Sequence, residues 1–85
     1  MKLTVKYFAS IREAAGIGEE VVDLPDTSIS LDALRTLLAS RSVRMAEALS
    51  REKVVRTAVD LELQSGSVTL RDGAEVAFFP PVTGG

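Results

Sequence analysis

The sequence predicts a single α+β domain in which one main helix packs across one face of a mixed β-sheet. Three observations predict this fold class. A chain of 85 residues is too short to form two separate cores. Apolar and polar residues alternate near both ends of the chain, as in half-buried strands, and an amphipathic helical stretch lies between these strands.

The first quarter of the chain predicts two strands joined by a helical turn. Residues 2–8 alternate between apolar and polar side chains, which indicates a half-buried strand. Ser10 and Glu13 then have the spacing of a capping box, and Gly16 can take the left-handed conformation that ends a short helix. Residues 19–24 are expected to form a second strand that can pair antiparallel with the first.

The clearest helical pattern covers residues 31–41. Ser30 is the expected N-cap. The helix is expected to bury one apolar stripe against the sheet, formed by Leu31, Leu34, Leu37 and Leu38. A weaker helical stretch follows at residues 43–49.

The second half of the chain predicts further strands. Residues 54–63 are strand-like, with an interruption near Asp60. The remaining pieces are, in chain order, a turn at Gly66, a short apolar piece at residues 68–70, a turn at residues 71–73 and a final strand at residues 75–79. We therefore expect a domain over residues 1–79 and an extended tail over residues 80–85.

Composition excludes several functions. A net charge of −2 disfavours nucleic-acid binding. The chain has no cysteine and no histidine, which removes disulfides, Cys/His zinc sites, thiolate nucleophiles and imidazole bases. The N-terminal residues alternate instead of forming an apolar signal-peptide run, so a cytoplasmic protein without membrane contact is expected.

Two charged clusters remain to be weighed. The basic cluster is formed by Arg41, Arg44, Arg51, Lys53 and Arg56. It could be a patch for an acidic partner or a phosphate, but interspersed glutamates favour an ordinary solvated face, and we assign no site there. The acidic cluster is formed by Glu19, Glu20, Asp23 and Asp26, and its place along a strand and its exit favours a solvated edge over a metal site.

The parity of the outer strands sets two phenylalanines apart. Phe8 falls on the polar face of the first strand, and Phe79 falls with Glu75, while Phe78 takes the opposite face. Either the strand ends twist and bury both rings, or Phe8 and Phe79 form an exposed apolar patch for a protein partner.

The chain ends in FFPPVTGG. Pro80 and Pro81 lack amide hydrogens, so the sheet ladder should end there and the backbone should leave in an extended form. Six positions from residue 80 reach about 20 Å when extended. Gly84 and Gly85 carry no side chain, so the terminus can pass through a narrow channel. The tail is expected to be disordered until a partner binds.

The reactive group at the end of this tail is the terminal carboxylate of Gly85. With an ordinary pKa of about 3.3 to 3.7 it is ionised near neutrality and is a poor electrophile. Another enzyme must activate it, for example as an acyl adenylate made from ATP. A terminal diglycine can also be an inert flexible end, but its position after a strand and two prolines favours a group carrier.

Over its whole length the chain resembles the small subunits of molybdopterin synthase, a family of ubiquitin-like sulfur carriers. The resemblance is carried by YFASIRE, LDALRTLLA, AVDLEL, RDGAEVAFFPP and the terminal VTGG. The last two segments are the most specific, since a diglycine alone also ends thiamine-pathway sulfur carriers, tRNA-thiolation carriers and ubiquitin-like protein modifiers. The resemblance implies the β-grasp, or ubiquitin-like, fold.

The resemblance also implies a reaction cycle. An adenylyltransferase related to ubiquitin-activating enzymes would use ATP and Mg²⁺ to adenylate Gly85, and a cysteine desulfurase or rhodanese system would supply sulfur to make a thiocarboxylate. The large subunit of molybdopterin synthase would then transfer this sulfur to cyclic pyranopterin monophosphate, forming the dithiolene of molybdopterin. The chain would bind no cofactor or metal itself, would be a non-catalytic subunit, and would join a heterotetramer.

Individual roles follow from the same resemblance. Pro80 and Pro81 would set the exit of the tail, Val82 and Thr83 would line the threaded segment, and Gly84 would give clearance. A separate set of apolar residues would contact the partners, namely Phe8, Leu63 and Phe79.

One position departs from the family. Asp60 stands where relatives often have asparagine, which puts a turn or hydrogen bond there in doubt. Two other classes stay open: a protein modifier that forms isopeptide bonds to lysines, and an interaction domain with an inert tail.

Overall fold

The structure, a computed structural model, describes residues 1–81 of the chain. It contains the following elements in chain order: β1 (Lys2–Tyr7), α1 (Ala9–Ala15), β2 (Glu19–Asp23), β3 (Ser28–Ser30), α2 (Leu31–Ala39), α3 (Val43–Ala48), β4 (Arg56–Val59), β5 (Glu62–Leu63), β6 (Thr69–Arg71) and β7 (Glu75–Phe79). None of the helices in this part of the chain is long and apolar enough to cross a membrane.

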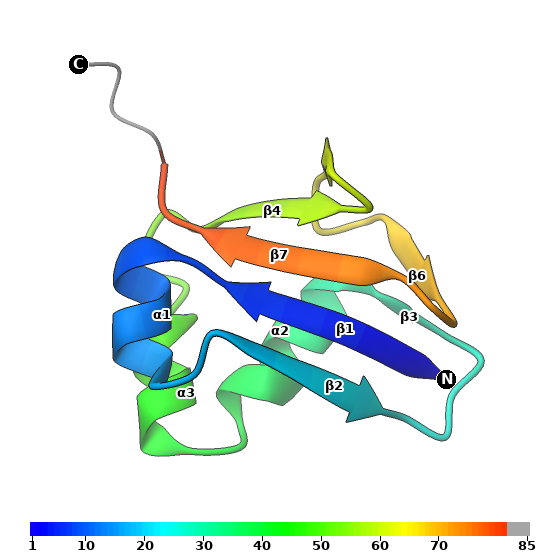
Figure 1. Ribbon diagram of the computed structural model, residues 1–85, viewed down its shortest axis with the longest axis horizontal. Coiled ribbons are helices and arrows are strands. Elements are labelled where there is room, and N and C mark those ends of the chain that lie inside the picture. The colour runs from blue at the N-terminus through cyan, green and yellow to red at the C-terminus, as the bar shows by residue number, and fades with distance from the viewer. Residues whose placement is uncertain (82–85) are drawn as a thin grey trace.

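The main sheet is mixed, as predicted. Its five strands lie in the order β2-β1-β7-β4-β5. β1 pairs antiparallel with β2 and parallel with β7, and β4 pairs antiparallel with both β7 and β5. The first and last strands of the domain therefore lie side by side in the middle of the sheet, with α2 and α3 behind it (Figure 1).

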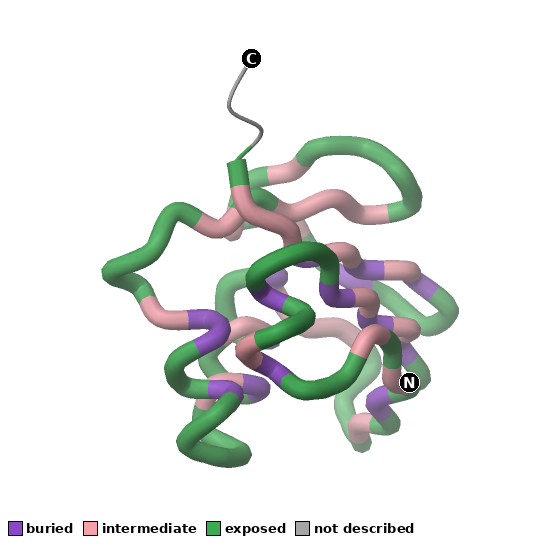
Figure 2. The backbone as a smooth tube through the Cα atoms, turned by 60° about the vertical axis from the view of Figure 1, so that its left-hand side comes forward, coloured by how far each residue is buried: buried purple, intermediate pink, exposed green. Residues whose placement is uncertain are grey.

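The core fills the space between the sheet and the helices. The sheet contributes Leu3, Val5, Tyr7, Val22, Val76 and Phe78, and the helices contribute Ile11, Ala15, Leu31, Leu34, Leu38, Met45 and Ala48. Burial alternates along the strands, because successive side chains point to opposite faces (Figure 2). One face of the sheet is therefore covered by helices.

The predicted capping box at the start of α1 is wrong. The N-cap is Phe8, which makes no side-chain capping bond, and Ser10 already lies inside the first turn of the helix. One extended residue separates the strand from the helix, and because this residue is phenylalanine, the N-cap side chain has no oxygen that can accept a hydrogen bond. The predicted left-handed end at Gly16 is confirmed by its φ of 80°.

The main helix begins as predicted, with the hydroxyl of Ser30 accepting a hydrogen bond from the amide of Ala33 at 3.0 Å. It ends two residues earlier than expected, at Ala39. The predicted apolar stripe is partly wrong, because Leu37 is 37 % exposed. Leu34 and Leu38 are four positions apart and share the buried face, whereas Leu37 lies on its flank.

Two features of the strand pairing were not predicted from the sequence. β3 is a three-residue strand that pairs with β6 in a separate two-stranded sheet. The expected strand with an interruption is in fact the hairpin of β4 and β5, whose turn holds Asp60 and Leu61 at φ of 49° and 72°. Positive φ at both positions is the requirement of a tight hairpin turn.

Candidate functional site

The site begins where β7 ends. Phe79 is the last residue of this strand, and Pro80 and Pro81 follow outside any strand. Because β7 lies between β1 and β4, the chain leaves from the middle of one end of the sheet (Figure 1). The predicted roles of Val82, Thr83, Gly84 and Gly85 fall outside the described residues.

The last strand separates core from surface at two neighbouring positions. Phe78 is fully buried, and its ring stacks on that of Tyr7 with the centroids 6.0 Å apart. Phe79 points to the opposite face and is partly exposed. The parity predicted from the sequence is confirmed for both rings.

Phe8 joins Phe79 on the face away from the helices. Its amide donates a hydrogen bond to the carbonyl of Phe78 at 3.0 Å, which continues the parallel pairing of β1 with β7 by one residue. The side chain of Phe8 is 46 % exposed. The alternative that the strand ends twist and bury this ring is therefore wrong.

Leu63 reaches the same face through the register of the sheet. It lies opposite Ala58, which lies opposite Ala77, which lies opposite Lys6. Residues directly opposite one another point to the same side of a sheet, and Leu63 is 68 % exposed. We call the apolar part of this side the open face, formed by Phe8, Ala58, Leu63, Ala77 and Phe79.

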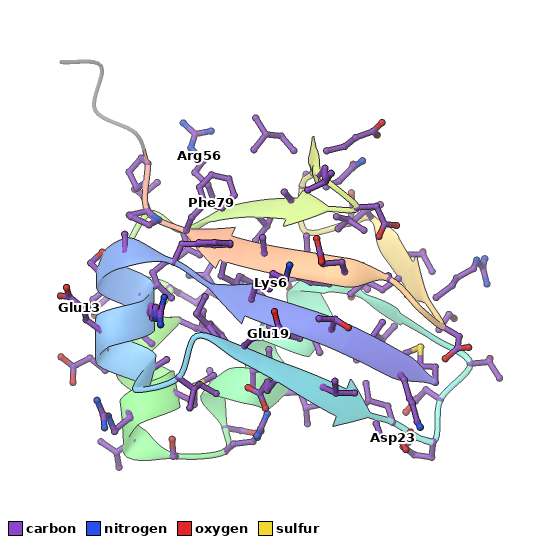
Figure 3. All side chains as sticks on the ribbon, in the orientation of Figure 1. Lys6, Glu13, Glu19, Asp23, Arg56 and Phe79 are labelled. Carbon is purple, nitrogen blue, oxygen red and sulfur yellow. The ribbon has the colours of Figure 1, made fainter. Side chains whose placement is uncertain are left out.

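A charged strip borders the open face. The ammonium group of Lys6 lies 2.9 Å from Glu75 on β7 and 3.8 Å from Glu19 on β2. The hydrogen bond with Glu75, followed by the charge of that carboxylate, raises the pKa of Lys6 above its ordinary value. Figure 3 shows Lys6 and Glu19 on the viewer's side of the sheet, with Phe79 and Arg56 near the exit of the chain.

Arg41 and Arg44 of the basic cluster are bound within the domain. Arg41 pairs with Glu20 at 2.8 Å, and Glu20 also accepts a hydrogen bond of 2.7 Å from the hydroxyl of Tyr7. Burial, followed by this hydrogen bond, raises the pKa of Tyr7. Arg44 donates to the carbonyls of Glu13 and Ala14 and so binds the end of α1.

The chemistry that these residues can perform is limited. Within residues 1–81, no group of three or more acidic, histidine or cysteine side chains is placed to hold a metal ion. The side chains of the open face are apolar and can bind a protein surface, but they cannot activate a substrate.

Strand parity predicted that Phe8 and Phe79 lie on an exposed face, whereas the partner contact of Leu63 was predicted from the family resemblance alone. The missing signal was the turn at Asp60, because a two-residue hairpin there fixes which residue of β5 lies opposite Ala58. The place of Arg56 opposite Phe79 was also missed, since it depends on the pairing of β4 with β7.

Comparison with known proteins gives a consistent picture. The sequence profile of the ThiS family matches residues 5–85. The chain is 44 % identical over 85 residues to the molybdopterin synthase sulfur carrier subunit of Escherichia coli, covering 98 % of this chain and 99 % of the relative. It is also 32 % identical over 92 residues to small archaeal modifier protein 3 of Haloferax volcanii, covering 100 % of both chains.

Solved structures share the fold. A Pyrococcus furiosus protein described as subunit 1 of a molybdopterin converting factor superposes with a TM-score of 0.78 at 32 % identity, over 96 % of this chain and 99 % of that one. A chain from the complex of subunits 1 and 2 of the Helicobacter pylori molybdopterin-converting factor superposes with a TM-score of 0.66 at 25 % identity, over 100 % of both chains. The β-grasp fold expected from the sequence is confirmed by these neighbours.

Proposed function

The chain belongs to the ThiS family, and from this membership we infer that it is the sulfur carrier subunit of a molybdopterin synthase, acting in molybdenum cofactor biosynthesis. The observation that carries this inference is similarity over the full length to molybdopterin synthase sulfur carrier subunits from several organisms. A partial match would support only the fold.

The geometry supports a carrier. β7 is an inner strand of the sheet, so its end at Phe79 is held in place by β1 and β4 on either side. Pro80 and Pro81 follow directly and restrict the direction in which the chain continues. The chain therefore leaves the domain at a fixed point beside the open face. A partner that binds the open face would be held in a fixed position relative to this exit, and so relative to the C-terminus.

We propose that the carrier is loaded at Gly85 by adenylation followed by sulfur transfer. A carboxylate oxygen attacks the α-phosphorus of ATP, which forms an acyl adenylate and releases pyrophosphate. The outer sulfur of a protein persulfide then attacks the acyl carbon and displaces AMP, which gives an acyl disulfide. A thiol reductant cleaves the S–S bond by disulfide exchange, which releases the thiocarboxylate. The adenylyltransferase would supply the ATP and Mg²⁺ site, and a cysteine desulfurase or rhodanese system would supply the sulfur.

The loaded terminus would then enter the active site of the large subunit. There the sulfur would pass to cyclic pyranopterin monophosphate, and each carrier would deliver one of the two dithiolene sulfurs. Val82, Thr83 and Gly84 would occupy the channel, with Pro80 and Pro81 at its mouth. The chain would be the non-catalytic subunit of the complex.

The open face is the proposed contact with both partners. The Helicobacter pylori structure is a complex of subunits 1 and 2, and the chain that resembles this one covers it completely. We propose that Phe8, Leu63 and Phe79 bind the large subunit, with two small subunits flanking a dimer of large ones. The same three residues would bind the adenylyltransferase, so loading and transfer would exclude one another. The cytoplasm is the compartment proposed for this cycle.

A second candidate is protein modification, which the similarity to small archaeal modifier protein 3 favours. Both functions need an activated C-terminal glycine, and they differ in the nucleophile that takes the acyl group. Sulfur carriers for thiamine or tRNA thiolation share the first step as well. The fold alone therefore does not separate these functions.

Intact mass spectrometry separates them. After incubation with its adenylyltransferase, ATP and a sulfur donor, the carrier should gain the mass difference between one sulfur and one oxygen atom. Conjugates of higher mass on lysines, with no thiocarboxylate form, would contradict the proposal and support a modifier.

A further inference from the structure

An open cleft of about 470 Å³ lies beside the open face. Its helical wall comes from the first turns of α2 and from the loop before β4, and its other wall comes from β4, β5 and the residues that follow them. Arg56 and Leu63 line this cleft, and both also point to the open side of the sheet by their register. The cleft and the open face are therefore continuous.

The charge of the cleft is opposite to that of the whole chain. Its lining includes three guanidinium groups, of Arg35, Arg51 and Arg56, and one carboxylate, of Asp32. The local net charge is therefore positive, whereas the chain carries −2. The half-buried Val55 adds apolar surface between these groups.

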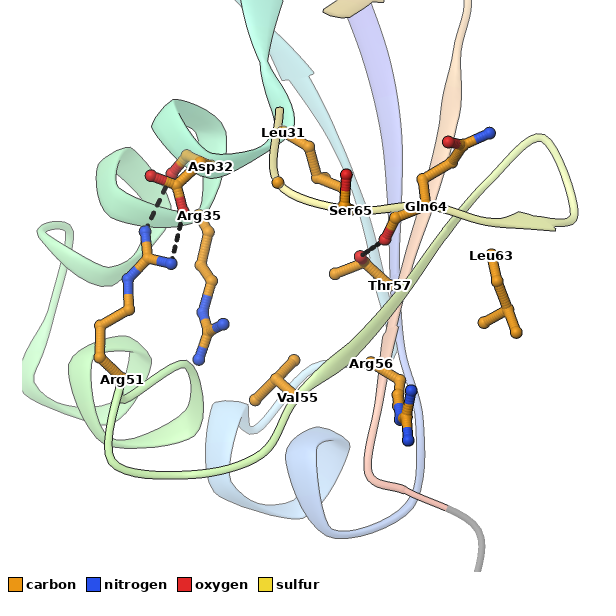
Figure 4. Close-up of a pocket in the computed structure, with 11 residues that line it drawn as sticks. Leu31, Asp32, Arg35, Arg51, Val55, Arg56, Thr57, Leu63, Gln64 and Ser65 are labelled. Atoms are coloured by element: carbon orange, nitrogen blue, oxygen red, sulfur yellow. Dashed lines mark hydrogen bonds and ion pairs between the residues drawn. The ribbon is translucent and has the colours of Figure 1, made fainter. Parts of the chain in front are cut away.

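Two of the three arginines are held in place. Arg51 binds the Asp32 carboxylate (Figure 4). Its Nη2 also donates to the Thr36 hydroxyl at 2.9 Å. Arg35 donates through Nε to the carbonyl of Leu49 at 3.0 Å and through Nη2 to that of Ser50 at 2.8 Å. The positive charge on the helical wall is thus fixed before any ligand binds.

The pKa of Arg35 is lowered from its ordinary value. Burial lowers it first, and the nearby charge of Arg51 lowers it further, while Asp32 opposes the shift only in part. An anion in the cleft would stabilise the protonated form of Arg35.

Arg56 differs from the other two arginines. Its side chain is exposed and makes no hydrogen bond or ion pair with any of residues 1–81. It lies opposite Phe79, at the end of the sheet where the chain leaves. Its five N–H donors are available to a planar carboxylate that approaches along the open face.

We propose that this cleft binds an acidic side chain, aspartate or glutamate, of the protein that docks on the open face. Arg56 donates to the carboxylate, Arg35 and Arg51 supply the surrounding positive potential, and the half-buried Val55 contacts the methylene groups of the bound residue. The inference rests on the proposed function for its choice of partner, the large subunit of molybdopterin synthase.

The experiment compares two charge reversals of the same kind. Arg56→Glu removes the proposed donor, and Arg71→Glu makes the same change at an exposed arginine of β6 that does not line the cleft. Both variants should keep the melting temperature of the parent, because neither side chain has a partner in the described part of the chain. Affinity for the purified large subunit is measured by calorimetry at low and at high salt.

We expect Arg56→Glu to weaken binding by about tenfold or more at low salt and to reduce its salt dependence, because a charge at the rim acts mainly by electrostatic attraction. Arg56→Lys should keep part of the affinity, since it keeps the charge but loses the planar fork. Equal affinities for the Arg56→Glu and Arg71→Glu variants would overturn the proposal while leaving the docking of the open face intact.

Two further outcomes are distinguishable. If the parent protein fails to bind the large subunit, the proposed function fails and the cleft proposal fails with it. The other check is a titration of the free chain with inorganic phosphate, in which the amide chemical shifts are measured. Saturable shifts at the cleft, abolished by Arg56→Glu, together with unchanged affinity for the large subunit, would overturn the carboxylate in favour of a phosphate ligand.

Discussion

Phe78 and Phe79 are neighbours in β7, yet their rings lie on opposite sides of the sheet. Phe78 is fully buried against Tyr7, whereas Phe79 is partly exposed beside Phe8 on the open face. The same residue type at adjacent positions therefore serves the core in one case and the surface in the other. This makes the pair a matched test of which face binds a partner.

Phe78→Ala should destabilise the fold, and Phe79→Ala should weaken binding to the large subunit. Truncation of a buried phenylalanine costs about 3 to 5 kcal/mol, because it leaves a cavity in the core. Loss of an aromatic residue at the centre of an interface costs about 2 kcal/mol or more of binding free energy. Thermal unfolding measures the first effect and calorimetric titration the second.

The two variants control for one another. Phe79→Ala should keep most of the parent's free energy of unfolding, since its ring is not part of the core cluster. A Phe79→Ala variant that binds with the parent's affinity would show that the open face is not the contact surface.

Leu63→Ala should also weaken the complex, by an amount that Val43→Ala does not reproduce. Both are exposed aliphatic side chains, at 68 % for Leu63 and 84 % for Val43, but only Leu63 belongs to the open face. Val43 begins α3, on the helical side of the domain. Calorimetry with the large subunit should show a clear loss for Leu63→Ala alone, and equal losses for both would contradict this assignment.

The sequence was sufficient for the larger elements. The alternation of residues in β1 and β7 gave the buried and open faces, and the capping pattern of Ser30 gave the start of α2. These features depend on side chains within one element. The prediction for the start of α1 was wrong because nothing in the sequence indicates that Phe8 alone separates the strand from the helix.

Features that depend on pairing between distant strands could not be predicted. Neither β3 nor its partner β6 has enough residues to show a periodicity, so the second sheet is visible only in three dimensions. The cleft shows the same limit, because Arg35, Arg51 and Arg56 come from α2, a loop and β4. In the sequence, Arg51 and Arg56 belonged to a basic cluster for which a solvated face was favoured over a patch for an acidic partner or a phosphate.

The free energy of unfolding should fall as the pH rises above about 10. Burial raises the pKa of Tyr7 from its ordinary value of 10.0, so the folded protein retains a proton that the unfolded chain loses. The contribution of Tyr7 to the free energy of unfolding is complete below the pKa of the unfolded chain. It is lost progressively as the pH rises from that value through the folded pKa. Lys6, whose pKa is also raised, adds a fall of the same sign above its ordinary value of 10.5.

Tyr7→Phe should make this fall less steep, at the cost of the hydrogen bond to Glu20, which is worth about 1 kcal/mol near neutral pH. The chain has one tyrosine and no tryptophan, so phenolate absorbance reports Tyr7 alone. Phenolate should appear together with unfolding in an alkaline titration. Phenolate formation in a folded chain near pH 10 would contradict the burial argument.

Asp60→Asn should leave stability within about 0.5 kcal/mol, whereas Asp60→Ala should cost about 1 kcal/mol or more. The Oδ1 atom of Asp60 accepts a hydrogen bond from the amide of Glu75 at 3.0 Å, and φ is 49°. Asparagine keeps this acceptor and tolerates the left-handed conformation. The departure at this position therefore preserves the turn. Chemical denaturation of both variants measures the difference, and an equal loss for the two would show that the carboxylate charge is required.

Reconstituted sulfur transfer shows whether the chain carries sulfur to the molybdopterin precursor. The thiocarboxylated chain is mixed with the large subunit and cyclic pyranopterin monophosphate, and molybdopterin is quantified. We predict stoichiometric product from the loaded chain, and none from a chain that lacks Gly85 or carries one appended residue, although both variants should fold. No molybdopterin from the loaded chain, or equal yields from the altered termini, would contradict this prediction.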